Sequence, residues 1–463
     1  MSYELFIGVF LLGTCLLYLV HKAVFRDGFR TWLSLPFITL MGCTLLYVFD
    51  YLRMPVDARD LFISAKNYAS LILFMGLFVS LTLLGDLFGT SFAKRKLARA
   101  SLHGQKPDSK RFYLRLGIAL FLIGSLAMAA FISTSGGFTV KYSAVHGSAS
   151  NFSTAYLYRL PISLYTACFI LLVSKFKFKN VPLAVLLVIA ACLAFLLFDA
   201  VTQGKRGDLI RYALLIIIPL FLFGHLRKTR QVPAILAIGC LALFLNYAPY
   251  LRQATSLGTL GNFDQVLKSL PDVTDKSREA RIRISQEGKH VVFASNALAG
   301  AVEYNQPNYG YRWMFPFINL VPRAIWPDKP SRYDMGYTTY DMLADDSPFS
   351  MPSGSHTGGM VESFIEWGYF VLPIWFLFGL TGGYLLETST RSRSIHSCVL
   401  LFGFYNFYVH FLLQDTVAGI LFLMYSLGPY FALRLILSLA PTRKPYRPLR
   451  ARHSNVRRTT RKI

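Results

Sequence analysis

The sequence predicts an all-α protein that crosses a membrane many times, and three observations lead to this fold class. Of its 463 residues, 54% are hydrophobic and only 16% are charged, which is too apolar for a soluble chain of this length. The apolar residues form blocks close to the length at which an α-helix spans the hydrocarbon core of a bilayer. Basic residues cluster in every second connection between the blocks, as expected of a polytopic membrane protein.

About eleven blocks have the length of a spanning helix, and they divide the chain into four parts. Residues 1–248 hold eight of them as an N-terminal bundle, and residues 361–440 hold three more. Between the two groups, residues 249–360 are expected to form one long loop domain outside the membrane. Residues 441–463 are a basic tail. The expected spans are residues 5–20, 32–48, 68–87, 113–132, 155–173, 181–198, 209–223, 232–248, 369–386, 398–413 and 419–439.

The basic connections decide the expected orientation. No basic residue precedes the first block, whereas Lys22, Arg26 and Arg30 follow it directly. Their side should therefore face the cytoplasm, together with the tail, which lies on anionic lipid. The N-terminus and the 249–360 loop should face the opposite compartment. The basic residues that produce the net charge of +24 lie in these connections and in the tail, where membrane orientation accounts for them. The charge therefore does not indicate a nucleic acid as partner.

The long loop has two expected parts. Apolar positions at helical spacing predict one or two amphipathic helices over Gly261–Gly300, whereas Asn305–Ser355 should be irregular. Within the second part, Pro322–Pro330 has the pattern Pro-Arg-x-x-Trp-Pro-x-Lys-Pro, whose prolines preclude a continuous helix. A stiff aromatic segment that carries Arg323 and Lys329 suits an anionic lipid head group. The alternative is an interfacial anchor whose cations only meet lipid phosphates.

Two further positions can supply cations at the same membrane face. The segment Gly204–Arg211 combines a glycine turn with Lys205 and Arg206 at the start of a helix, whose N-terminal amides favour anions. Arg252 lies just after the eighth block. Together with Arg323, Arg206 and Arg252 can converge on one phosphate group, which arginine binds through two parallel hydrogen bonds. The alternative is an ordinary turn whose basic side chains extend to the interface.

A candidate general base lies where the loop returns to the membrane. The segment Pro352–Gly368 contains His356, Glu362 and Glu366, and we expect both glutamates on one face of the spanning helix that starts there. Carboxylates at such a position are usually functional, and histidine accepts protons near neutral pH. The alternative is that His356 and Glu362 only hold the loop in place by hydrogen bonds.

Several kinds of site have no counterpart in the sequence. It contains no P-loop, no GxGxxG after a strand, no HExxH, no zinc-ligand spacing and no DxD pair in an outer loop. All six cysteines lie in apolar blocks, which argues against disulfides. We therefore expect no metal ion and no other cofactor. The acidic residues at other outer helix ends, Glu303 and Asp415, are weaker candidates for the base.

Three segments, in this order, resemble the oligosaccharide repeat-unit polymerases, the Wzy-type enzymes of O-antigen, capsule and exopolysaccharide synthesis. They are Gly204–Ile210, Val321–Pro330 and Gly359–Gly368, of which the proline-rich run is the most specific. The topology and the long late loop are similar as well, so the resemblance covers most of the chain. The spacing from His356 to Gly368 is also close to that of the related O-antigen ligases.

The resemblance implies a GT-C-like helical fold in a bacterial inner membrane, with an active site at the periplasmic face. It implies a glycosyltransferase whose donor and acceptor are undecaprenyl-diphosphate-linked oligosaccharides, with a chain-length regulator as a possible partner. Arg206, Arg252 and Arg323, assisted by Lys205 and Lys329, would bind the diphosphate.

The resemblance also assigns the remaining roles. His356 and Glu362 would act as general base and orienting group; the family pattern favours Glu362 as the base, whereas the ligase comparison favours His356. Tyr304, Tyr309 and Trp326 could stack on sugar rings or serve only as interfacial aromatics. Two other functions stay open: ligase-type transfer to a different acceptor, and movement of the lipid-linked oligosaccharide by a flippase. A flippase would need basic residues at mid-membrane depth, whereas the unusual cations here lie at one face.

Overall fold

The computed structural model describes residues 3–54, 59, 63–101, 108–134, 159–178, 180–203, 206–224, 289–304, 307–321, 325–330, 357–413 and 416–439. All regular secondary structure in these segments is helical. Eight helices among them are long and apolar enough to cross a membrane. The expectation of an all-α polytopic membrane protein is therefore confirmed.

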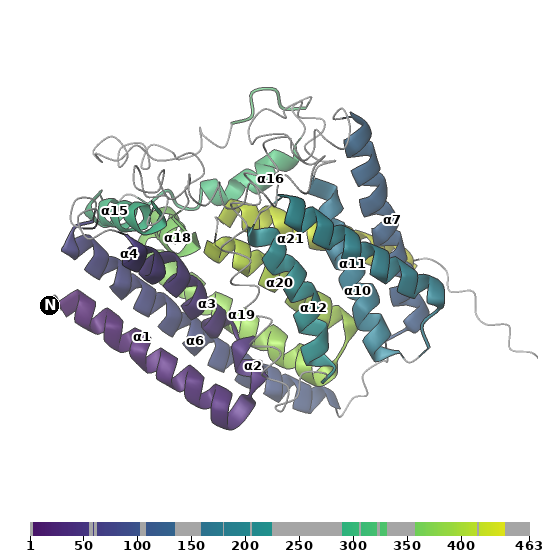
Figure 1. Cartoon of the computed structure of the whole chain (residues 1–463), viewed down its shortest axis with the longest axis horizontal. Helices are drawn as coiled ribbons and strands as arrows, with labels where there is room; N and C mark the ends of the chain where they lie inside the picture. Colours follow the sequence, from purple (N-terminus) through teal and green to yellow (C-terminus); the bar gives the residue numbers. More distant parts are fainter. Residues whose placement is uncertain are drawn as a thin grey trace, which may run out of the picture.

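The helices follow the apolar blocks of the sequence, and Figure 1 shows them in chain order. Every expected span overlaps a described helix except residues 232–248, which lie outside the described residues. The longer helices are α1 (Tyr3–His21), α3 (Leu35–Cys43, continued by a π-helical turn Thr44–Phe49 and α4, Asp50–Arg53), α6 (Ala65–Ser101), α7 (Lys110–Thr134), α10 (Ser163–Lys177), α11 (Leu183–Gln203), α12 (Arg206–Leu222), α19 (Val371–Ser392), α20 (Ile395–Leu413) and α21 (Thr416–Leu439).

Shorter helices lie at the ends of the long ones. They are α2 (Phe29–Trp32), α15 (Lys289–Tyr304), α16 (Phe315–Leu320) and α18 (Gly359–Trp367). Helix α15 falls within the region expected to hold amphipathic helices, and it buries Val291, Val292 and Leu298. The first part of that region, residues 261–288, lies outside the described residues. In the part expected to be irregular, the structure has the short helix α16, preceded by a single 3-10 turn at Arg312–Met314.

The ends of the long helices gather at two levels. We call one level the loop end; it comprises α15, α16, α18 and the helix termini beside them, as where Asn67 of α6 donates to Asn296 of α15 (3.2 Å). The opposite level, which we call the basic end, includes Lys177, whose ammonium lies 2.6 Å from the carboxylate of Asp108. The basic connections that follow α1, α10 and α19 also meet here, because Lys22 contacts Asp86 of α6, and Arg30 and Arg391 both contact Glu387.

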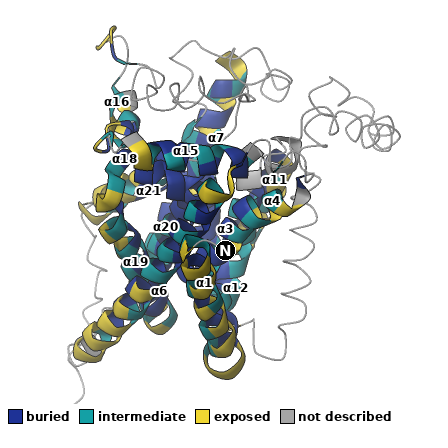
Figure 2. Ribbon diagram, turned by 90° about the vertical axis from the view of Figure 1, so that its left-hand side faces the viewer, coloured by how far each residue is buried: buried dark blue, intermediate teal, exposed yellow. Residues whose placement is uncertain are grey.

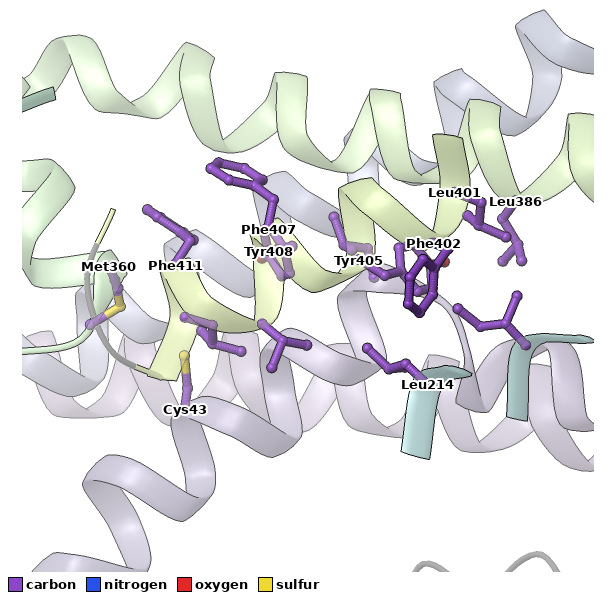
Figure 3. Packing of buried hydrophobic residues seen from close by; sticks show 14 of the residues in the cluster. Cys43, Leu214, Met360, Leu386, Leu401, Phe402, Tyr405, Phe407, Tyr408 and Phe411 are labelled. Atoms are coloured by element: carbon purple, nitrogen blue, oxygen red, sulfur yellow. The ribbon is translucent and has the colours of Figure 1, made fainter. Parts of the chain in front are cut away.

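Helix α20 forms the centre of the buried core. Its aromatic side chains Phe402, Tyr405 and Tyr408 are almost completely buried. Figure 3 shows them along α20, with Leu214 of α12 and Cys43 of α3 packed against the helix. Such continuous burial explains why this apolar block carries no helical periodicity, because every face of α20 meets another helix.

The outermost helices carry the exposed apolar surface. Figure 2 shows exposed residues along α1, whereas α20 is mostly buried or intermediate. Phe6, Phe10 and Leu17 of α1 are all more than half exposed. In a protein that spans a membrane, such a face contacts lipid chains rather than water.

Helices α6 and α19 pack with their backbones in contact. A Cβ atom on Gly379 would lie 2.0 Å from the carbonyl oxygen of Thr82, and one on Gly85 would lie 2.1 Å from that of Phe376. Gly383 of α19 meets the backbone of Asp86 in the same way. Small residues at such spacing allow the closest helix packing that membrane proteins use.

The basic end is held by buried ion pairs. Glu387 of α19 is fully buried and pairs with both Arg30 and Arg391. Asp86 of α6 is also buried and lies 3.9 Å from the ammonium of Lys22. Through these contacts, Lys22 and Arg30 bind the connection between α1 and α3 to helices α6 and α19.

Candidate active site at the loop end

The two glutamates of the Pro352–Gly368 segment lie on α18, a helix of nine residues at the loop end. Gly358 precedes α18 with φ +79° and Gly368 follows it with φ +54°, conformations that favour glycine. Both glutamates lie at the loop end of the candidate span Gly359–Ser392, as expected, but on a separate helix, α18, within that span. The chain turns at Gly368 and α19 starts at Val371, because a residue with positive φ interrupts an α-helix.

Glu366 is completely buried and binds the loop segment that precedes α16. Its carboxylate accepts hydrogen bonds from the backbone N–H of Arg312 (3.2 Å) and from the side-chain amide of Asn308 (3.2 Å). The backbone N–H of Gly310 donates to the carbonyl oxygen of Glu366 (3.2 Å). These bonds satisfy polar groups at the C-terminal end of α18 and fix the Asn308–Arg312 turn against it.

Glu362, one turn earlier on α18, is 1% exposed and binds the start of α21. Its Oε2 atom accepts hydrogen bonds from the backbone N–H (2.7 Å) and the hydroxyl (3.2 Å) of Thr416. A carboxylate at the N-terminus of a helix is stabilised by the unsatisfied amides and by the helix dipole. Glu362 therefore acts as a cap supplied to α21 by a different helix.

Arg312 lies between the two carboxylates and is 5% exposed. Its Nη1 atom is 3.7 Å from Glu362 Oε1, and its Nε atom is 3.9 Å from Glu366 Oε1. The expectation that Glu362 and Glu366 face the same way is thus confirmed, since one guanidinium lies beside both. Arg312 joins the loop segment to α18 and, through Glu362, to α21.

Arg312 itself was not among the residues selected from the sequence. The sequence does indicate its role, because Arg312 lies within an aromatic segment from Tyr309 to Phe317. A cation that becomes buried in such a segment needs an anionic partner. Close aromatic packing accompanies that burial: the rings of Trp313 and Trp367 meet edge to face at 5.5 Å. Gly310, with φ +76°, lets the turn approach Trp367, because a Cβ atom there would lie 2.2 Å from its ring.

Three of the predicted substrate-binding side chains are described. Lys329 is buried, and its ammonium donates to the carbonyl oxygen of Val321 (2.8 Å). Tyr309 is 72% exposed and Trp326 is 42% exposed, so both are accessible to a ligand at the loop end.

The side chains of most other predicted site residues lie outside the described part of the chain. His356, Lys205, Arg252 and Arg323 lie outside the described residues, as does Asp415. The structure describes only the backbone of two more, Arg206 as the first residue of α12 and Tyr304 as the last of α15. Glu303, the other weak candidate for the base, is exposed on α15. The convergence of the three arginines therefore stays a prediction.

The described part of the chain contains no group of three or more His, Cys, Asp and Glu side chains arranged to hold a metal ion. The described loop-end residues form a buried cluster of charged groups, in which backbone amides and one guanidinium orient the two carboxylates.

Comparisons with protein-family models, with curated proteins and with solved structures find no match for this chain.

Proposed function

We propose that this protein is a glycosyltransferase that joins undecaprenyl-diphosphate-linked oligosaccharide repeat units into a surface polysaccharide, in a bacterial inner membrane. The observation that carries the proposal is the contact of Arg312 with Glu362 and Glu366. It joins α18, which is one of the three resembling motifs, to the segment that leads directly into another, Val321–Pro330. Arg312 lies nine residues before the Val321–Pro330 motif, so its contact with α18 supports a site that both motifs share.

The positive-inside rule gives the orientation within this proposal. The loop end faces the periplasm and the basic end faces the cytoplasm, so the N-terminus is periplasmic and the tail cytoplasmic. About eleven spans and a GT-C-like arrangement belong to the same proposal.

The proposed reaction is a displacement at the anomeric carbon of the donor. An acceptor hydroxyl forms the new C–O bond, the bond from the anomeric carbon to the diphosphate breaks, and lipid diphosphate leaves. Arg206, Arg252 and Arg323, with Lys205, stabilise the negative charge that develops on the leaving group, which makes a metal ion unnecessary. Lys329 belongs to the same proposed diphosphate site, and its ammonium donates to the carbonyl oxygen of Val321.

The base must take the proton of the acceptor hydroxyl. The contacts of Glu362 with Thr416 and Arg312 favour the orienting role for this residue and leave His356 as the proton acceptor. Exposed Tyr309 and Trp326 are available to stack on sugar rings.

The test is a polymerisation assay with purified protein and lipid-linked repeat units, with products separated by length. His356→Ala should lower turnover by roughly 10²–10⁴-fold while donor binding survives. Glu362→Gln should also slow turnover, and Glu4→Gln, a half-buried glutamate at the loop end of α1, is the matched control. Wild-type turnover in both the His356 and Glu362 variants would exclude these two residues as base and orienting group.

The same preparation separates the alternatives. Transfer of a finished chain to a non-polymerising acceptor, without growth of the chain, would identify a ligase. Movement of lipid-linked oligosaccharide across a liposome membrane without a new glycosidic bond would identify a flippase.

A further inference from the structure

Tyr47 joins the N-terminal part of the chain to the start of α18. It lies in the π-helical turn Thr44–Phe49 and is completely buried. Its hydroxyl donates to the carbonyl oxygen of Thr357 (2.8 Å), which lies two residues before α18. Single π-helical turns within α-helices occur frequently at functional sites. The contact brings a residue from outside the three sequence motifs to the helix that carries Glu362.

The backbone at Gly358 and Gly359 packs closely on both sides. A Cβ atom on Gly358 would lie 2.4 Å from the hydroxyl oxygen of Tyr47. A Cβ atom on Gly359 would lie 2.1 Å from the carbonyl oxygen of Phe411, near the C-terminal end of α20. Figure 3 shows the next residue, Met360, beside Phe411. The start of α18 is therefore held between Tyr47 and the end of α20.

The first turn of α18 connects this contact to Glu362. The backbone N–H of Glu362 donates to the carbonyl oxygen of Gly358 (3.0 Å). Thr357, which accepts the hydrogen bond from Tyr47, precedes Gly358 in the chain and is itself buried. One series of bonds thus runs from the Tyr47 hydroxyl to Glu362, whose carboxylate caps α21 at Thr416. We expect a displacement at Thr357 to move that carboxylate.

We propose that Tyr47 is a positioning residue, whose hydrogen bond to Thr357 fixes the start of α18 and thereby holds the Glu362 carboxylate in place. Its effect on catalysis rests on the function proposed above, in which Glu362 has the orienting role. Such a group must be held to within about 0.5 Å of its productive position. A residue that supports it therefore changes the rate without touching the substrate.

Tyr47→Phe removes only the hydroxyl group, and Tyr408→Phe is its matched control. Tyr408 is also completely buried, and its hydroxyl lies 2.6 Å from Thr39 Oγ1, which makes a hydrogen bond between α20 and α3. Both variants thus lose a buried tyrosine hydroxyl from the same helical region. Their melting temperatures in detergent should fall by similar amounts, so the pair separates general stability from the positioning role.

Hydrogen exchange at the Glu362 amide measures the start of α18 independently of activity. Because this amide donates to Gly358, Tyr47→Phe should accelerate its exchange roughly 10-fold. Tyr408→Phe should leave it unchanged. Equal exchange in Tyr47→Phe and the wild type would overturn the proposal.

The polymerisation assay tests the consequence for the reaction. Tyr47→Phe should lower kcat roughly 10-fold and leave the KM for the lipid-linked donor unchanged, because it displaces an orienting group and not the diphosphate site. The loss should disappear when Tyr47→Phe is added to Glu362→Gln, since the hydroxyl acts through Glu362. A wild-type kcat in Tyr47→Phe, an equal loss in both backgrounds, or an equal loss in Tyr408→Phe would refute the positioning role.

The two measurements separate this inference from the proposed function. If the wild type makes no polymer but Tyr47→Phe accelerates exchange at Glu362, the proposed function fails and the support of α18 by Tyr47 stands. If the wild type polymerises and Tyr47→Phe changes neither exchange nor kcat, this inference fails alone.

Discussion

Replacement of Arg312 by methionine is the most direct perturbation of the loop-end site. Methionine keeps much of the length of the arginine stem but removes the positive charge between Glu362 and Glu366, which are each 1% exposed or less. At 3.7 Å and 3.9 Å, each pair contributes about 4 kcal/mol of Coulomb attraction at an effective dielectric constant of about 20, before desolvation.

The expected net effect is smaller than the sum of these attractions. Removal of one partner of a buried ion pair typically costs about 3–5 kcal/mol, because the remaining charge stays buried. Glu366 keeps its hydrogen bonds to Asn308 and to the backbone of residue 312, and Glu362 keeps those to Thr416. We therefore expect the lower part of that range, about 3 kcal/mol, for docking of the loop segment onto α18.

Hydrogen exchange measures this docking directly. The amides of Gly310 and Arg312 donate to the carbonyl and carboxylate of Glu366, so their protection reports whether the turn is bound. A loss of about 3 kcal/mol should accelerate their exchange roughly 100-fold. Arg391→Met, at the basic end, should leave these amides unchanged.

A double-mutant cycle with Glu366→Gln adds the pairwise coupling. The coupling energy between Arg312→Met and Glu366→Gln should be about 1–3 kcal/mol, since the two groups share one buried network. Protection that is unchanged in Arg312→Met, with a coupling energy near zero, would show that the ion pairs do not hold the site together.

Three further predictions concern packing, topology and the diphosphate site. Gly379→Leu should destabilise the protein by about 3 kcal/mol or more, as measured by thermal unfolding in detergent. Gly13→Leu is the control and should not destabilise it, because no atom lies within 4 Å of the added carbon. Equal melting temperatures of the two variants would contradict the α6–α19 contact. An impermeant thiol reagent on intact cells should label Ser277→Cys but not Ser454→Cys, and the reverse pattern would invert the orientation. Arg323→Ala should reduce transition-state binding by about 2–5 kcal/mol in the polymerisation assay, with partial recovery in Arg323→Lys; full-length product at normal rates would place the diphosphate elsewhere.

The sequence predicted the helices well because the length of an apolar block is a local property. Each block needs only enough residues to cross the hydrocarbon core, and no tertiary information is required to find it. The sequence placed the start of the apolar span at residue 369 but did not predict that the glutamates lie on a separate helix; a positive φ at Gly368 and a 3-10 turn over Gly368–Phe370 separate α18 from α19.

The candidate site was predicted in part. Glu362 and Glu366 were selected because acids at a membrane helix end are unusual. Arg312 was missed because its partners lie about fifty residues away along the chain, at a distance that helical spacing does not connect.

The backbone contact of α6 with α19 also restricts how the protein can move. A shift of either helix by one residue would place a side chain where Gly85 or Gly379 now meets a carbonyl oxygen, so the two helices cannot shear past each other. The two helices form a closely packed pair, and the turn at Gly368 connects α18 to the loop end of α19. For the lipid-linked substrate proposed above, we expect the polyprenyl chain to reach the loop end between other helices, because α6 and α19 leave no space between their backbones.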